Sequence, residues 1–205
     1  YQKTIGILRK VFGPEHNEVL LVYHAMAMMH MKMEEHGEAI EAFRKCLGIK
    51  LKKLGPWHPE LIGSHANIAA ACFLVKDYAQ SLEHNRKILE IHLEIHGSNH
   101  PKIAESYHAV ASLHSYLQQY EEAIDLYQKS LAIRMQALGP EHLQVGHSYK
   151  NLGMAHRNIK EDAKALEYFY KATAIFQKTL GSEHPETLGT QRIVKQLKAS
   201  APEPE

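Results

Sequence analysis

The sequence predicts an all-α protein, built as a solenoid of antiparallel helix hairpins and closed by a C-terminal capping helix. Three observations predict this fold. The 205-residue chain repeats itself every 42 residues, each repeat spaces its apolar residues as helices do, and a glycine marks each junction between repeats. A single hairpin cannot bury its apolar faces alone, so stacked neighbours must supply the core.

Three residue series recur with the same period and no insertion. The glycines are Gly13, Gly55, Gly97, Gly139 and Gly181; the histidines are His16, His58, His100, His142 and His184; the isoleucines are Ile7, Ile49, Ile91, Ile133 and Ile175. This register predicts the second half of a preceding repeat's second helix at 1–12, four repeats at 13–54, 55–96, 97–138 and 139–180, a capping helix at 181–199 and a disordered tail at 200–205. The chain is therefore expected to start inside a repeat of a longer protein.

In each repeat, apolar residues recur three, four and seven positions apart, and this spacing predicts two helices of roughly 16 residues. In the third repeat these helices fall at 101–117 and 121–137, with a short turn between them. The junction glycine suits the left-handed backbone just beyond a helix end. The junction histidine precedes the next helix, where its ring can bond unpaired backbone groups.

Small residues recur where two helices must approach closely. They are Ala27, Ala69, Ala111 and Gly153 in the first helices, and Ala39, Ser81, Ala123 and Ala165 in the second. Large residues share another position, namely Phe43, Tyr127 and Phe169, with Asn85 as the exception. This alternation predicts interlocking hairpins.

The final helix is expected to cover the last hairpin with its apolar side chains and to turn its charged side chains to water. The apolar positions are Leu188, Ile193, Val194 and Leu197, and the polar ones are Arg192, Lys195, Gln196 and Lys198.

Composition excludes several classes of protein. A net charge of +1 does not give the positive field that nucleic-acid binding needs, so no direct nucleic-acid partner is expected. No apolar run is long enough to cross a membrane and no secretory signal is visible, which predicts a cytoplasmic protein, with cytoskeletal or organelle association left open. The two cysteines, Cys46 and Cys72, read as small core residues and not as a redox pair.

The 16 histidines raise the question of a metal site. His92, His96 and His100 are spaced four apart, but His100 belongs to the junction series and no acidic or cysteine ligand stands at a suitable distance. No phosphate-binding glycine loop, catalytic carboxylate pair or nucleophile with a base is recognisable. The chain is thus predicted to be no enzyme, with no metal and no cofactor.

The repeats resemble the tetratricopeptide repeat. The fourth repeat carries the residues of its signature, Tyr149, Leu152, Gly153, His156, Ala165, Phe169 and Ala172. The 42-residue period and the Leu-Gly-x-x-His-Pro junction are similar to the longer-helix subclass of kinesin light chain, nephrocystin-3 and clustered-mitochondria proteins. The resemblance implies a right-handed superhelix in which the first helix of each hairpin lines a concave groove.

The predicted groove residues are those of the first helices that the hairpin contact does not use. They are Leu21, His24, Met28, Met31, Lys32, Asn67, Ala70, Phe73, Glu105, His108, Ser112, Tyr116, His147, Lys150, Asn151, Met154, Arg157 and Asn158. Asparagine can pair with an extended peptide backbone, and methionine adapts its shape to varied side chains. Lys32, Lys150 and Arg157 favour an acidic peptide, with Glu105 opposing.

Two departures from relatives narrow the ligand. Kinesin light chain carries Leu-Asn-Asn-Leu in many first helices, whereas only Asn67 and Asn151 remain here, so the same cargo peptides are not assumed. The carboxylate clamp of chaperone-binding repeats needs an asparagine four residues after its lysine, but Met154 follows Lys150 at that spacing.

The predicted function is therefore non-catalytic binding of a peptide or partner protein in the groove, as an adaptor or scaffold. One alternative is an architectural repeat in a large ciliary or mitochondrial-surface assembly. Another, by analogy with clustered-mitochondria proteins, is an RNA-associated role. The oligomeric state is left open.

Overall fold

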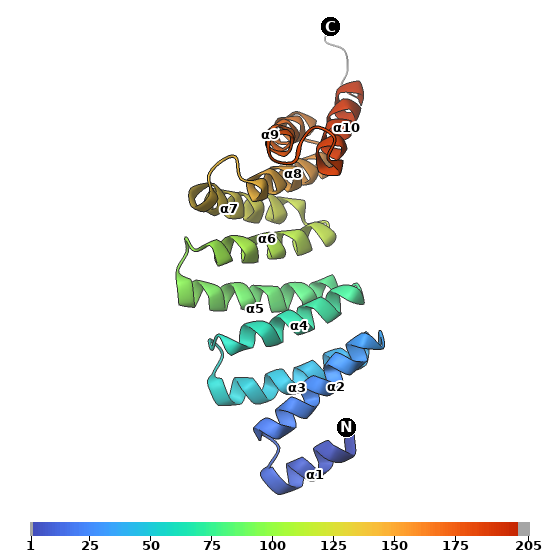
Figure 1. Ribbon diagram of the computed structural model, residues 1–205, viewed down its shortest axis with the longest axis vertical. Helices are drawn as coiled ribbons and strands as arrows, with labels where there is room; N and C mark the ends of the chain where they lie inside the picture. The colour runs from blue at the N-terminus through green and yellow to red at the C-terminus, as the bar shows by residue number, and fades with distance from the viewer. Residues whose placement is uncertain (1, 201–205) are drawn as a thin grey trace. The chain divides into compact units, whose positions relative to one another are not determined.

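The computed structural model describes residues 2–200 and contains ten α-helices and no strand in that range (Figure 1). Contacts along the chain divide it into two compact units, unit 1 at Tyr1–Gly97 and unit 2 at Ser98–Glu205. The predicted tail at 200–205 lies outside the described residues except for Ser200, which ends the last helix.

Unit 1 contains two helix hairpins, α2 with α3 and α4 with α5, preceded by α1, which packs on α2. Its helices are α1 (Gln2–Phe12), α2 (Asn17–Lys32), α3 (His36–Leu54), α4 (Glu60–Leu74) and α5 (Tyr78–His96). Two clusters of buried apolar side chains lie among these helices, one around Phe43 and one around Tyr23.

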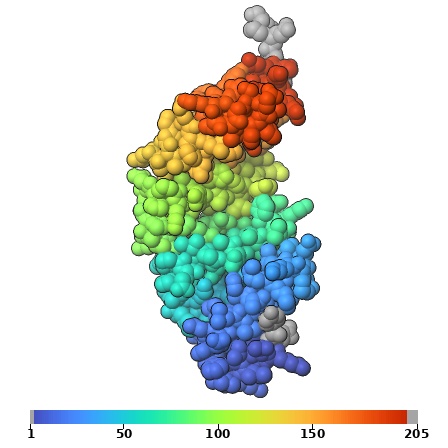
Figure 2. All heavy atoms as spheres, viewed as in Figure 1, coloured from blue at the N-terminus to red at the C-terminus, as the bar shows by residue number. Residues whose placement is uncertain are grey.

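Unit 2 repeats this plan with α6 and α7 as one hairpin, α8 and α9 as the next, and α10 packed on α9. Its helices are α6 (Pro101–Tyr116), α7 (Tyr120–Leu138), α8 (Leu143–Asn158), α9 (Asp162–Leu180) and α10 (Pro185–Ser200). In the space-filling view, side chains fill the spaces that the ribbon leaves between neighbouring helices of each unit (Figure 2).

The second helix of every complete hairpin is longer than predicted, at 19 residues. The first helices have 15 or 16 residues, close to the prediction. The turn inside each hairpin is as short as predicted, at 33–35 in the first hairpin, so the extra length lies at the ends of the second helices, as in α7, which extends from Tyr120 to Leu138.

The junctions between repeats have the predicted chemistry. All five junction glycines adopt positive φ angles, from 69° to 93°, in the left-handed region that disfavours a Cβ atom. All five junction histidines accept a hydrogen bond at Nδ1 from the backbone N–H two residues later, at 3.2–3.3 Å. Both predictions are confirmed, and together they fix where each first helix begins.

The turn inside each hairpin holds a feature that the sequence did not reveal. A non-glycine residue takes a left-handed conformation at the same place in every repeat, with φ of 60–62°: Glu34, Lys76, Gln118 and Lys160. The next backbone N–H bonds back to a carbonyl of the first helix, as in Glu35 to His30 at 2.9 Å. The four turns therefore share a backbone conformation, although the residue that adopts it differs from turn to turn.

Close packing at the small positions follows the prediction. The alanines and Ser81 at these sites are at most 4% exposed, and Gly153 is buried against the Phe169 ring. Phe43, Tyr127 and Phe169 are likewise buried. Asn85 is only half-buried, and its side-chain amide donates to the Ser81 carbonyl at 2.9 Å, which satisfies the polar group that replaces the ring.

The capping helix corrects one prediction. Val194 and Leu197 are buried against α9 as expected, but Leu188 is 42% exposed and does not cover the hairpin. Thr187 and Thr190 are buried in its place, at 0% and 1% exposed. They lie on the same helix face as Val194 and Leu197, and the Thr187 hydroxyl donates to the Gly181 carbonyl at 2.8 Å, so helical phase outweighed hydrophobicity.

Candidate functional site

Every residue predicted to line the groove lies on α2, α4, α6 or α8, the first helices of the hairpins, and none of them is buried. Side chains that are accessible and lie on the first helices alone can form one binding face. Nine of the eighteen predicted residues line one of two hollows, one in unit 1 and the other in unit 2.

The hollow of unit 1 has a volume of about 280 Å³ and lies among α2, α3 and α4. Three predicted residues line it, together with six that the sequence reasoning missed. The predicted ones are Leu21, His24 and Asn67, and the others are Leu20, Phe43, Cys46, Lys50, Gly63 and Ser64. A signal existed for part of the missed set, because Phe43, Cys46 and Lys50 stand three and four positions apart on α3 and so share one face.

Three predicted groove residues of unit 1 expose large apolar side chains. Leu21 is 57% exposed, Met28 43% and Phe73 37%. The thiol of Cys46 is not a reactive group, because burial raises its pKa to about 11 and so keeps it protonated at neutral pH. The hollow of unit 1 is therefore lined mainly by uncharged side chains, with Lys50 as the charged residue among them.

The hollow of unit 2 has a volume of about 440 Å³ and lies among α6, α7 and α8. Six predicted residues meet there, joined by three others. The predicted ones are His108, Ser112, Tyr116, Asn151, Met154 and Asn158, and the others are Ser115, Tyr127 and Ala155. The prediction of Glu105, His147, Lys150 and Arg157 as groove residues stays untested, since they do not line this hollow.

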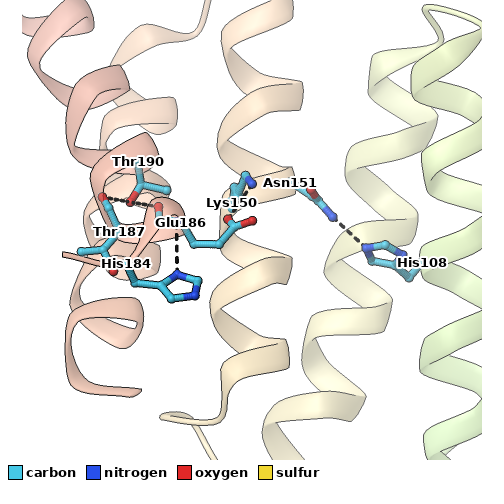
Figure 3. Close-up of polar contacts among 7 residues, drawn as sticks. All are labelled: His108, Lys150, Asn151, His184, Glu186, Thr187 and Thr190. Carbon is cyan, nitrogen blue, oxygen red and sulfur yellow. Dashed lines mark hydrogen bonds and ion pairs between the residues drawn. The ribbon is translucent and has the colours of Figure 1, made fainter. Parts of the chain in front are cut away.

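Two hydrogen bonds and one ring contact link four side chains at the unit 2 hollow. Asn151 donates from Nδ2 to Nε2 of His108 at 2.7 Å, which joins α8 to α6 (Figure 3). The His108 ring meets Tyr127 edge-on at 5.4 Å, and the Tyr127 hydroxyl lies 3.1 Å from the Ser112 hydroxyl. These contacts hold the four side chains in place.

The protonation state of His108 follows from its surroundings. Burial, followed by the nearby charges of Arg134 and His147, lowers its pKa to about 4. The ring is therefore neutral at pH 7 and can accept the Asn151 proton. Asn151 then keeps its side-chain oxygen, which bonds no described residue, as an acceptor for a ligand N–H.

Lys150 is not the unpaired cation that the acidic-peptide prediction assumed. Its ammonium lies 2.7 Å from Glu186 at the start of α10, and this hydrogen bond lowers the pKa of the Glu186 carboxyl (Figure 3). No pattern in the sequence indicates that two residues 36 positions apart form an ion pair. Lys32 and Arg157 remain exposed and form no ion pair among residues 2–200.

Other site chemistries find no support in the part of the chain that the structure describes. There, no three histidine, cysteine, aspartate or glutamate side chains come together in a way that could hold a metal ion. Likewise, none of the described helices combines the length and the apolar character needed to cross a bilayer. Cys46 and Cys72 are buried and unbonded to each other, in line with their predicted core role.

Comparison with known families identifies the repeat. A tetratricopeptide repeat model matches residues 61–136 and 107–178, and a second tetratricopeptide repeat model matches residues 21–53. No curated protein matches the chain.

Several solved structures share the fold. A kinesin-light-chain-type protein of Podosopora anserina with nearly identical TPR-like repeats is 26% identical, with a TM-score of 0.72 over 90% of this chain and 87% of that one. RapI in its apo form (22% identity, TM-score 0.71, 88% and 63% covered) and BtubC from P. vanneervenii (17%, 0.65, 99% and 90%) are similar in fold alone.

These relatives support a protein–protein interaction module in general. The predicted resemblance to kinesin light chain agrees with one of these solved structures, which is itself described as a kinesin light chain. The likeness to nephrocystin-3 and clustered-mitochondria proteins stays a prediction.

Proposed function

The chain belongs to the tetratricopeptide repeat family, and we propose that it binds an extended peptide segment of a partner protein on the exposed faces of its first helices, without catalysis. It would thereby act as an adaptor or scaffold.

One observation carries this proposal above the others. Six residues picked from sequence alone for their groove position surround a single open hollow in unit 2. They include a hydrogen-bonding amide that is already oriented, Asn151, and two exposed side chains that give contact area, Tyr116 and Met154. Oriented polar groups beside accessible aromatic and methionine side chains are typical of peptide-recognition surfaces.

The energetics favour modest affinity. The hollow is already formed and His108 already holds Asn151, so little entropy is lost by the protein on binding. The peptide, in contrast, loses its own conformational freedom. We expect a dissociation constant on the order of micromolar for one segment, unless several segments bind together.

The test uses peptides selected on the full 205-residue chain from a random 12-residue display library. Affinities of the selected peptides are then measured for Asn151→Ala and Tyr116→Ala. Each variant is expected to weaken binding about 5- to 20-fold, because a well-packed or oriented contact contributes on the order of 1–2 kcal/mol.

Matched controls use the same residue types elsewhere in unit 2. Asn99→Ala changes an exposed junction residue and Tyr170→Ala an exposed ring on α9. Both are expected to leave affinity within twofold. Peptides whose binding ignores the Asn151 and Tyr116 variants, or falls equally with the controls, would reject the proposed face.

A further inference from the structure

Another hollow of unit 1 lies among α1, α2 and α3, where the described chain begins (Figure 1). It has a volume of about 440–490 Å³ by comparison with the unit 2 hollow, at about 490 Å³, and none of the predicted groove residues lines it. Its lining includes three cations from two helices, namely Arg9 on α1 and both Lys45 and Lys52 on α3. All three side chains are exposed, so a ligand can reach them from solvent.

The charges that line this hollow do not cancel. Lys52 lies 2.9 Å from the Glu15 carboxylate, which is the one acidic group among the described residues of the lining. Arg9 and Lys45 form no ion pair among residues 2–200. The Lys45 ammonium lies instead over the ring of Tyr23, 5.6 Å from its centroid, and Tyr23 also lines the hollow. Two positive charges thus remain without a counter-ion.

The equivalent place in unit 2 lacks the arginine. Three repeats after Arg9, the same position holds Met135, whose sulfur accepts a hydrogen bond from the Tyr149 hydroxyl at 3.7 Å. Tyr149 is the counterpart of Tyr23. The cation that accompanies the tyrosine in unit 1 is therefore replaced by an uncharged thioether in unit 2.

The lysine that both units share has different partners. Lys171, the counterpart of Lys45, forms an ion pair with Glu167 on the same helix at 2.5 Å. The carboxylate at the equivalent place in unit 1 is Glu41, which lies 3.7 Å from Arg44 instead. An ion pair offsets the charge that a lysine can offer to a ligand, so Lys45 is the more available of the two cations.

Gly48 opens the wall of the hollow between Lys45 and Lys52. It is exposed inside α3 and lines the hollow, and a Cβ added there would meet no atom within 4 Å. Glycine inside a helix is less stable than alanine, and no close packing requires a glycine at this position. Its counterpart in unit 2 is Ala174. The missing side chain leaves room for a ligand beside the two lysines.

We propose that this hollow binds a phosphorylated side chain of a partner protein. The site goes beyond the proposed function, because it is separate from the predicted groove residues. A phosphate monoester carries about 1.5 to 2 negative charges at pH 7 and has three acceptor oxygens, which match the two uncompensated cations and the planar N–H fork of Arg9. A carboxylate, with one charge, would leave one of these cations unpaired.

The shape of the hollow favours a projecting side chain over a membrane surface. The cations line a recess that extends to Tyr23 and Ile49, which are only 9% and 8% exposed. An anionic bilayer spreads its charge over a broad surface. The exposed carboxylates of Glu15 and Glu18 would oppose such a surface beside the hollow.

The experiment follows the Gly48 backbone amide by NMR in the full ¹⁵N-labelled chain at pH 7 and constant ionic strength. The probe is the peptide acetyl-Gly-phosphoserine-Gly-amide, and peptides with serine or glutamate in place of phosphoserine are titrated in parallel. The phosphopeptide is expected to move the Gly48 signal to saturation and to leave that of Ala174 nearly unchanged. We expect the glutamate peptide to bind at least threefold more weakly, and the serine peptide at least tenfold.

Charge variants test which cations hold the phosphate. Arg9→Gln and Lys45→Gln are each expected to weaken phosphopeptide binding about 5- to 20-fold, because each removes a charge-assisted hydrogen bond. Lys10→Gln is the matched control, since Lys10 is exposed next to Arg9 but does not line the hollow, and it should change the affinity less than twofold. Glu15→Gln removes the opposing carboxylate and is expected to bind about two- to fivefold more tightly.

Gly48→Leu separates ligand binding from a structural role. Its side chain would occupy part of the hollow, so binding of the phosphopeptide is expected to weaken at least tenfold. The melting temperature should stay the same or rise, because leucine favours a helix more than glycine does. A lower melting temperature with unchanged affinity would show that the glycine is structural and would reject the site.

Other contrary results overturn the inference as well. Equal weakening by Lys10→Gln and Arg9→Gln would show long-range screening, and equal affinities for the phosphoserine and glutamate peptides would exclude phosphate as the recognised group. Inorganic phosphate that binds as tightly as the phosphopeptide would indicate a free anion as the ligand. No response of Gly48 to any of these probes would reject the site outright.

A membrane ligand has its own arm of the experiment. Phosphatidylcholine vesicles with one tenth phosphatidylinositol 4-phosphate are tested for sedimentation with the chain. If these vesicles bind the chain through Arg9 and Lys45 while the phosphopeptide does not bind, the ligand is a lipid and the inference is wrong. The peptide test with Asn151 and Tyr116 is independent of all these outcomes, so the proposed function can stand or fall separately.

Discussion

Unit 1 and unit 2 present the same repeat positions with different chemistry. Where unit 1 has Gly63 and Lys50 around an open hollow, unit 2 has His147 and the buried Arg134. The backbone plan is common to both and each cation carries one positive charge, so the bulk of the side chain at the Gly63 or His147 position, and the burial of the cation, distinguish the two places.

The asparagines of the two units differ in the same way. Asn67 and Asn151 occupy equivalent positions, as do His24 and His108. Only in unit 2 does the histidine accept a hydrogen bond from the asparagine, whereas Asn67 lines its hollow without a bonded partner among the described residues. A repeated residue type is thus not a repeated interaction.

The largest expected effect comes from removing the ring at the shared large position in each unit. Phe169→Ala should destabilise unit 2, and Phe43→Ala unit 1, by about 3–5 kcal/mol each, because both rings are almost fully buried. Urea unfolding followed by far-ultraviolet circular dichroism measures this loss.

Trp57, the only tryptophan and located in unit 1, reports on that unit by fluorescence. If the units unfold separately, Phe43→Ala moves the fluorescence transition and Phe169→Ala does not. If both variants shift the fluorescence transition equally, the two units unfold together as one cooperative unit.

A smaller effect should have opposite signs in the two units. Alanine at Gly146 would place its Cβ 2.8 Å from the buried Phe176 ring, so Gly146→Ala should cost about 1–3 kcal/mol. Gly63, in the interior of α4, has no atom within 4 Å of such a Cβ, and Gly63→Ala should stabilise by about 0.5–1 kcal/mol. Melting temperatures compare the pair directly, and a loss in both would show that the α4 site is less open than described.

The smallest effect concerns pH and a histidine pair of unit 1. His65 and His84 contact each other through their Nδ1 atoms at 2.8 Å, and burial followed by the charges of His84 and Lys87 lowers the pKa of His65 to about 4. Burial and the charge of Arg44 also lower the pKa of His84, while Glu83 opposes this shift. Glu83 and Glu90 oppose the shift of His65.

The His65 imidazole takes up a proton near pH 6.5 in the unfolded chain but only near pH 4 in the folded one. The pair therefore does not reduce the free energy of unfolding above pH 6.5, and the free energy of unfolding falls as the pH drops from 6.5 to 4. We expect a loss on the order of 1 kcal/mol, or about 2–4 °C in melting temperature. His65→Gln should flatten this part of the profile. The exposed helix-cap variant His142→Asn should not, and an unchanged slope in His65→Gln would exclude the pair as its cause.

The local features of the fold could be predicted because they depend on residues close together in the chain. The five capping histidines and five left-handed glycines are examples, since each acts within a few residues of itself. The left-handed residues inside the hairpins could not be predicted, because Glu34, Lys76, Gln118 and Lys160 are ordinary long polar residues, and none is a glycine or an asparagine that would indicate a positive φ.

The candidate site was predictable only in part. Position in the repeat was enough to bring His108, Tyr116 and Asn151 to one hollow. The contribution of the second helices was missed, because Phe43 and Tyr127 were assigned wholly to the core although each also lines a hollow.

The sequence by itself determined the helices, their register and the repeat, because a 42-residue period carries this information in every copy. Only the tertiary structure decided that Lys150 pairs with Glu186, that Thr187 and not Leu188 is buried, and that Arg134 is buried without a carboxylate. The physical reason is that burial and ion pairing depend on which side chains of other helices fill the neighbouring space. That depends on the packing of a given copy, and the repeat pattern leaves it open.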